Sequence, residues 1–169
     1  GAFDAIDAIS TAALHLGDAQ MRPSLFLRED GSILADAYVC RDDEAFWILA
    51  EGPSAAELVA HVERHAPSKD LALTELTASH GILSVHGPYA WELVGEALDP
   101  DVVGMPFLSL YRVDDVTCFR AGKTGEYGYD LLVPRGKVDE TLDRIQRVGA
   151  AFDTAEADLA VLDQCALEN

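Results

Sequence analysis

One stretch of the sequence combines a tight turn with a carboxylate in an apolar strand. Residues 124–130 read Thr-Gly-Glu-Tyr-Gly-Tyr-Asp, and the apolar residues 131–133 follow them. The two glycines are typical of a tight turn, because glycine adopts the backbone dihedrals that such turns need. A carboxylate within an apolar strand is costly unless it meets hydrogen-bond donors. A ligand with adjacent N–H groups, such as an aminopyrimidinone ring, would give Asp130 two hydrogen bonds. The alternative is a turn in which Asp130 accepts from nearby backbone or from an arginine.

The alternation of apolar and polar residues predicts two α+β units of similar element order around this turn. On a period of two, Asp130 and Leu132 share one face of the final strand, whereas Tyr129 and Leu131 share the other. The first unit is predicted to hold a helix at 3–14, strands at 24–28, 32–40 and 44–50, and a helix from Ser54, which forms a capping box with Glu57, to residue 65. The second is predicted to hold strands at 71–77, 81–85, 105–111, 116–120 and 129–133 and helices at 88–98, 138–148 and 155–167. We therefore expect subdomains at residues 1–67 and 68–169, divided near residues 67–69.

The charge balance excludes several classes of partner. The chain of 169 residues carries 12 Lys and Arg against 30 Asp and Glu, a formal charge of −18. Nucleic acid and anionic membrane surfaces are disfavoured, since both are polyanionic. Any bound anion must be held by a local arrangement of residues that overcomes this field. No apolar run is long enough to span a bilayer, and the start does not resemble a signal peptide, so we expect an acidic cytoplasmic protein.

The cysteines and paired histidines indicate no metal centre. Cys40, Cys118 and Cys165 are far apart, and their apolar neighbours predict buried, reduced thiols rather than disulfides or a zinc site. His61 and His65 have the spacing of a metal pair, but the segment between them is not HExxH and no third ligand is evident. A solvated helix face is the better interpretation of this histidine pair.

Four short motifs in register resemble the glycine-cleavage T-protein (aminomethyltransferase) family. The stretch that ends at Asp130 resembles the TGExGxE motif of that family, and residues 86–90 (HGPYA) resemble its strand–GPxA–helix step. Residues 30–39 resemble its GGxxDDLxV hairpin, and residues 105–107 fall where the family has a short strand. Order and spacing agree from Gly1 to Glu168, so the resemblance covers the whole chain.

The resemblance implies a folate-binding fold around a central tunnel, with tetrahydrofolate as the one-carbon acceptor. By this resemblance Asp130 stands where a carboxylate grips the N–H edge of the pterin, although Asp is one methylene shorter than the usual Glu. Asp36 occupies the second carboxylate of the family's paired-Asp position, beside the reacting nitrogens of the folate. A carboxylate there can orient the substrate amine and stabilise an iminium-like transition state. The alternative for Asp36 is a solvated face of the hairpin.

The remaining predicted site residues follow from the same resemblance. Tyr129 and Tyr127 are candidates for stacking on the pterin, with packing in the core as the alternative. Arg120 is predicted to meet a carboxylate of the folate tail, or else to be a surface cation, and Glu126 belongs to the predicted folate-binding set. His86 precedes the GPxA step and could face the cleft, although such a histidine more often satisfies the turn.

The sequence also departs from the family pattern. Residues 161–168 correspond to an ARDxxRLE-type segment in which Leu162 and Ala166 replace both arginines, and Ala35 replaces the first Asp of the pair. The chain begins after the family's N-terminal strand and ends before its C-terminal barrel domain. We therefore expect either a fragment of a longer protein or a reduced member whose open site is covered by a partner chain or a second copy.

Three functional hypotheses remain. The first is a tetrahydrofolate-binding one-carbon transferase that uses a small methyl or aminomethyl donor or a carrier protein. The second is a non-catalytic folate-binding relative that acts as an accessory protein, an assembly factor or an oxidase-type subunit. The third is a protein-interaction domain that keeps the fold without folate.

Overall fold

The chain divides into two compact units in the computed structural model, which describes residues 1–66 and 71–168. The units are Gly1–Thr77 and Ala78–Asn169. The division predicted at residues 67–69 falls outside the described residues, and the boundary between the units lies after Thr77. Leu71 packs against the core of the first unit, so the residues just before Thr77 belong to that unit.

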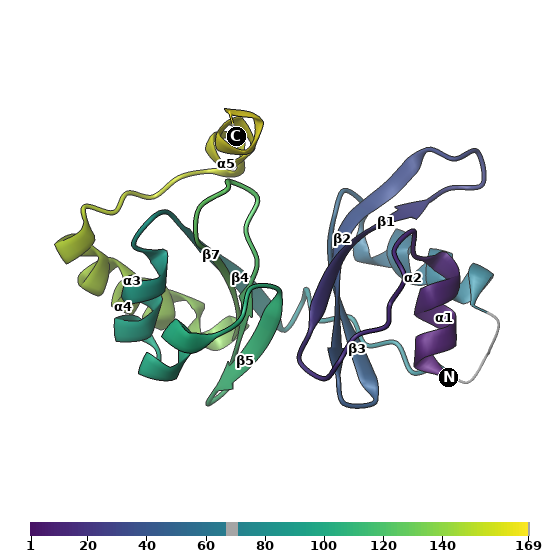
Figure 1. Ribbon diagram of the computed structural model, residues 1–169, viewed down its shortest axis with the longest axis horizontal. Coiled ribbons are helices and arrows are strands. Elements are labelled where there is room, and N and C mark those ends of the chain that lie inside the picture. Colours follow the sequence, from purple (N-terminus) through teal and green to yellow (C-terminus); the bar gives the residue numbers. More distant parts are fainter. Residues whose placement is uncertain (67–70, 169) are drawn as a thin grey trace. The chain divides into compact units, whose positions relative to one another are not determined.

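The first unit is a three-stranded antiparallel sheet packed against two helices (Figure 1). The sheet order is β1-β2-β3. Its elements are α1 (Ala2–Ile9), β1 (Met21–Leu27), β2 (Ile33–Asp42), β3 (Ala45–Glu51) and α2 (Ala55–His65). Strand β2 shows the period of two clearly: Ala35, Ala37 and Val39 are buried in the core, whereas Asp36 between them is exposed.

Local side chains set the ends of these elements. Asp30 Oδ1 accepts hydrogen bonds from Ser32 N at 3.0 Å and from Ser32 Oγ at 2.7 Å, and Gly31 takes a φ of 82°, so the β1–β2 turn forms where it is predicted. Ser54 caps α2 and exchanges hydrogen bonds with Glu57, which confirms the predicted capping box. The first helix is shorter than the predicted 3–14, because Ser10 leaves it to form a β-bridge with Phe26.

The second unit is a four-stranded antiparallel sheet in the order β4-β7-β6-β5. Its strands are β4 (His80–His86), β5 (Ser109–Val113), β6 (Val116–Arg120) and β7 (Gly128–Pro134), and its α-helices are α3 (Ala90–Ala97), α4 (Val138–Gly149) and α5 (Leu159–Glu168). Short 3₁₀ segments lie at Pro100–Gly104, Arg135–Lys137 and Ala150–Phe152. The core forms where α3 and α4 cover one face of the sheet (Figure 1); buried Leu93 and Val94 of α3 meet Leu131 and Val133 of β7 there.

Three elements predicted after residue 68 need correction. The strand predicted at 71–77 is wrong: residues 71–76 have no regular secondary structure, and Leu73 is exposed. The strand predicted at 105–111 begins only at Ser109, because Leu108 takes a φ of 58° and interrupts an extended chain. The last helix begins at Leu159 rather than near residue 155.

The thiols follow the sequence prediction only in part. Cys40 and Cys118 are buried, but Cys165 on α5 is exposed, so the prediction of three buried thiols is wrong at that residue. Burial, reinforced by the nearby Asp130 carboxylate, raises the pKa of the Cys118 thiol to about 12. Among the described residues, no helix is both long and apolar enough to cross a membrane.

Candidate functional site

Asp130 lies on β7, on the face of the sheet opposite α3 and α4. In the register of the sheet it stands between Ser84 of β4 and Phe119 of β6. Ser84 Oγ donates a hydrogen bond of 2.6 Å to Asp130 Oδ1. Residues 129, 131 and 133 of the same strand point into the core, so the half-buried Asp130 is the carboxylate that β7 presents on the other face. The sequence pattern placed Asp130 correctly, but nothing in it revealed Ser84, which only the cross-strand register brings to the carboxylate.

His86 lies on the same face, one step further along the ladder. It pairs with Gly128, as Ser84 pairs with Asp130. Both of its ring nitrogens are buried, and neither has a hydrogen-bond partner in the part of the chain that the structure describes. Burial lowers the pKa of the His86 imidazole, and the Asp130 carboxylate opposes this effect in part. A neutral imidazole, with one N–H donor and one acceptor nitrogen, is therefore the favoured form near neutral pH.

Gly128 makes room for this histidine. A Cβ atom at Gly128 would lie 2.4 Å from Ala121 O, 2.7 Å from Gly122 Cα and 2.9 Å from His86 Nδ1. Such contacts are too short for any side chain, so the second glycine of the motif is required by close approach and not only by turn geometry.

The structure does not bring Tyr129 and Arg120 to the face of Asp130. Tyr129 is fully buried in the core cluster, with its ring on the side that α3 and α4 cover. Burial raises the pKa of its phenol, and its hydroxyl has no partner among the described residues. The predicted stacking of Tyr129 on a pterin is corrected on this ground: a ring enclosed in the core offers no open face to a ligand.

Arg120 makes its side-chain contacts with residues of the second unit. Its guanidinium donates to Met105 O and lies 5.2 Å from the centroid of the Tyr127 ring, a cation–π distance. By strand alternation it shares the side of β6 that carries the buried Cys118, whereas Phe119 shares the side of Asp130. These contacts fit a residue that orders the loop before β7 better than one that meets a folate carboxylate.

The loop itself carries the other predicted residues. Tyr127 is 42% exposed, so its ring, unlike that of Tyr129, remains open on part of its surface. Glu126 is exposed, and Thr124 at the start of the motif is buried. Nothing in this arrangement assigns Glu126 a role.

Asp36 lies in the first unit, on β2, facing away from the core. Its partners in the register are Leu25 of β1 and Glu51 of β3. Two exposed carboxylates directly opposite each other on one face concentrate negative charge there. Such a position suits interaction with a cationic group.

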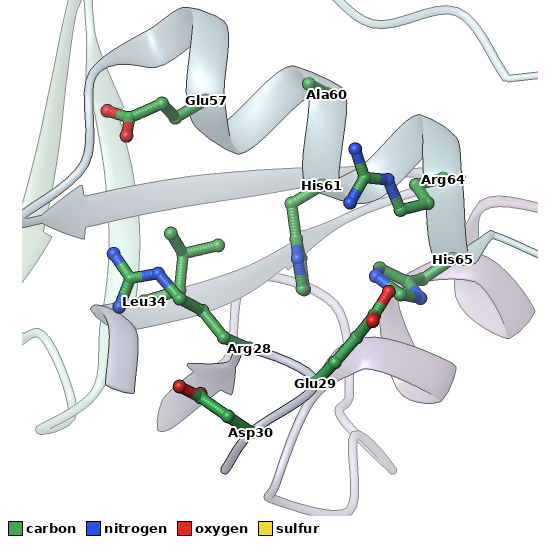
Figure 2. Close-up of a pocket in the computed structure, with 9 residues that line it drawn as sticks. All are labelled: Arg28, Glu29, Asp30, Leu34, Glu57, Ala60, His61, Arg64 and His65. Carbon is green, nitrogen blue, oxygen red and sulfur yellow. The ribbon is translucent and has the colours of Figure 1, made fainter. Parts of the chain in front are cut away.

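The first unit also carries an open groove of about 470 Å³ between the β1–β2 turn and α2 (Figure 2). Figure 2 shows Arg28, Glu29 and Asp30 on the turn and His61 and His65 reaching toward them from the helix. Burial, and then the neighbouring cations, lower the pKa of His61. The ring centroids of His61 and His65 are 4.7 Å apart, and no cluster of three or more possible metal ligands occurs in the described part of the chain. None of the residues predicted to bind folate lines this groove.

Comparison with known proteins identifies the class. The sequence matches the GCVT N-terminal domain family over residues 1–169, and the chain belongs to that family. It is 30% identical to an aminomethyltransferase of Mycobacterium leprae over 90% of this chain and 42% of that protein. It is 29% identical to an aminomethyltransferase of Herpetosiphon aurantiacus over 72% of this chain and 35% of that protein.

The fold agrees with the family. A crystal structure of glycine cleavage system aminomethyltransferase T from Bartonella henselae superposes with a TM-score of 0.77 at 24% identity, over 98% of this chain and 45% of that one. The predicted α+β fold of the aminomethyltransferase type is thereby confirmed. The chain spans less than half the length of each of these relatives.

Proposed function

We propose that this protein binds tetrahydrofolate and takes part in one-carbon transfer of the aminomethyltransferase type. The observation that carries the proposal is Asp130: a half-buried carboxylate at the start of β7, anchored by Ser84, in a chain of the GCVT N-terminal domain family. In this role Asp130 accepts hydrogen bonds from the adjacent N–H groups of the pterin.

The residues around Asp130 fit such a ligand. Ser84 Oγ donates to one oxygen of the Asp130 carboxylate and so fixes its orientation. Gly128 allows β7 to lie close against the backbone of Ala121 and Gly122. The exposed part of the Tyr127 ring, in the loop before β7, takes the stacking role that Tyr129 cannot fill.

Asp36 is proposed to orient the reacting amine. Tetrahydrofolate, when bound, supplies the nucleophilic nitrogens that accept the one-carbon unit. The negative charge of Asp36 and of its cross-strand neighbour Glu51 favours a substrate amine and the cationic character that develops during transfer. The one-carbon donor is a small methyl or aminomethyl compound or an aminomethyl group on a carrier protein.

A second function, folate binding without catalysis, is favoured by three positions. Ala35 stands where the family motif has the first Asp, and Leu162 and Ala166 stand where it has arginines. Loss of these charged groups removes interactions with the polar part of a folate but leaves the hydrogen bonds that Asp130 accepts from the pterin. Such a protein would act as an accessory or assembly factor, or as a subunit of a larger enzyme.

Calorimetric titration of the intact protein with tetrahydrofolate tests the proposal. The wild-type protein is expected to bind, and Asp130→Asn is expected to weaken binding at least tenfold, since an amide nitrogen opposes the pterin N–H groups. Asp143→Asn, an exposed carboxylate on α4, is the matched control and should bind as the wild type does. With tetrahydrofolate at about 100 times its dissociation constant, the free energy of unfolding should rise by about 2.7 kcal/mol.

The outcomes separate the hypotheses. If the folded wild-type protein does not bind tetrahydrofolate, the folate assignment is wrong, and the hypothesis of a protein-interaction domain remains. Binding with Asp130-dependent affinity supports it, and transfer from methyl and aminomethyl donors to the bound folate then distinguishes the enzyme from the accessory protein.

A further inference from the structure

The groove between the β1–β2 turn and α2 concentrates basic side chains in a strongly acidic protein. The chain carries 12 Lys and Arg against 30 Asp and Glu, yet Arg28, His61, Arg64 and His65 all line this groove of about 470 Å³. The groove lies within the first unit, and none of the residues proposed to act on folate lines it. A local group of basic residues is what an anion needs in order to bind against the negative field of the whole chain.

Helical spacing brings the basic residues of α2 to one place. His61, Arg64 and His65 are three or four positions apart, so they share one face of the helix. The His61 ring stacks on the buried Phe26 ring, with centroids 6.5 Å apart and planes at 17°. Figure 2 shows Arg28 on one side of His61, and Arg64 and His65 on the other. The stacked imidazole therefore lies between two guanidinium groups.

Both arginines have donors that the protein does not use. Arg28 Nη1 donates a hydrogen bond of 2.5 Å to Ile33 O, which holds the side chain over the turn. Within the described residues, Arg28 makes no other side-chain hydrogen bond and no ion pair, and Arg64 makes neither. An arginine without an ion pair is unexpected in a chain with a formal charge of −18. The planar donors of both groups suit a carboxylate or a phosphate.

Two carboxylates that line the groove are bound to their own turn or helix cap. Asp30 Oδ1 accepts from Ser32 N and Oγ, and Glu57 Oε2 accepts from Ser54 N and Oγ. These hydrogen bonds, and then the charge of Arg28, hold the pKa of both carboxyl groups below its usual range. Both serve the local structure, so neither neutralises an arginine by a direct contact.

We propose that this groove binds an extended dianion, such as a dicarboxylate, with one anionic group on Arg28 and the other on Arg64. His61 donates a ring N–H to the ligand between these two groups, and Leu34 and Ala60 contact the apolar carbons that separate its charges. An extended ligand is favoured over a compact anion because the two arginines lie on opposite sides of His61 (Figure 2). The proposal is independent of the folate function, so Asp130→Asn should bind the dianion as the wild type does.

The proposal also predicts how binding depends on pH. In the free protein burial, and then the charges of His65, Arg64 and Arg28, lower the pKa of the His61 imidazole, so the ring is neutral near pH 7. A bound anion favours the protonated ring, so binding takes up protons and affinity should rise as the pH falls from about 8 to 6. The charged and titratable groups that line the groove with His61 are Arg28, Glu29 and Asp30 on the turn and Glu57, Arg64 and His65 on the helix.

Titration of the intact protein with glutarate, followed by calorimetry, tests the proposal. Arg64→Gln should weaken glutarate binding about tenfold, because it removes charge-assisted hydrogen bonds to the ligand. Arg147→Gln is the matched control: Arg147 is exposed in the last turn of α4, as Arg64 is in the last turn of α2, and its replacement changes the net charge equally. This control should bind glutarate as the wild type does, and thermal melts establish that each variant is folded.

NMR signals of the His61 ring give a measurement on the wild-type protein alone. Glutarate should shift these signals, whereas butyrate, which carries one charge, and chloride at equal ionic strength should not. Inorganic phosphate, a compact anion, should bind more weakly than glutarate. Unchanged His61 signals with glutarate, equal shifts with chloride, tighter binding of phosphate, or equal losses of affinity in Arg64→Gln and Arg147→Gln would each overturn the proposal.

Discussion

Asp36 and Asp130 occupy equivalent places in two different sheets, yet their surroundings differ. Each lies on an interior strand and faces away from the packed core of its own unit. Asp36 is exposed and stands opposite a second carboxylate, Glu51, whereas Asp130 is half-buried and accepts a hydrogen bond from Ser84. The difference teaches that a strand carboxylate acquires its role from its cross-strand neighbours. A like-charged neighbour makes a site for a cation, and a hydroxyl neighbour fixes the carboxylate as an acceptor for donors.

The largest expected effect concerns Gly128, which lies on the same strand as Asp130. Gly128→Ala should lower the free energy of unfolding by about 3 kcal/mol, because two of the three atoms that its Cβ would strike belong to the backbone and cannot rotate away. Urea unfolding measures this loss. Gly136→Ala is the control, since a Cβ there meets no atom within 4 Å. Equal stability of the two variants would contradict the close packing around Gly128.

The next prediction separates the two carboxylates by function. Asp36→Asn should reduce the rate of one-carbon transfer at saturating folate about 100-fold while changing folate affinity little, because a positioning and charge-stabilising group acts mainly in the transition state. Asp130→Asn should instead reduce affinity at least tenfold. Single-turnover kinetics and calorimetry on both variants measure the split. Identical effects of the two variants on affinity would show that the distinction between them is wrong.

The features that the sequence predicted well are those determined locally. The capping box of Ser54 and the turn at Asp30 depend on residues two or three positions apart, and both are confirmed. Asp130 was placed on the correct strand because alternation fixes which residues share a face.

The features that the sequence missed depend on distant segments. Residues 71–76 alternate like a strand but have no regular secondary structure. Cys165 has an apolar neighbour, yet it lies on a helix whose surface is exposed. The resemblance of the motif to a folate-binding one predicts Tyr129 beside the ligand, but α3 and α4 cover its side of the sheet. Ser84 lies 46 residues from Asp130 in sequence, so no local pattern could pair them.

A smaller effect should follow from removing the hydroxyl that anchors Asp130. Ser84→Ala is expected to lower the free energy of unfolding by about 1 kcal/mol, since hydrogen bonds to charged groups contribute more than neutral ones but this one is partly open to solvent. A double-mutant cycle with Asp130→Asn isolates the interaction between the two side chains. Strict additivity of the two single effects would show that Ser84 does not position the carboxylate.

The smallest expected effect concerns the aromatic ring on the other face of β7. Tyr129→Phe keeps the buried ring but removes a hydroxyl that has no partner among the described residues, so it should leave the free energy of unfolding unchanged or raise it by about 0.5 kcal/mol. Folate affinity should be the same as in the wild type, because the ring lies on the side of the sheet away from Asp130. Tyr89→Phe, whose ring is 57% exposed, gives the effect of removing a solvated hydroxyl for comparison. A tenfold loss of folate affinity in Tyr129→Phe would show that Tyr129 contacts the ligand. The two faces of β7 would then no longer differ in function, and the assignment of Asp130 depends on that difference.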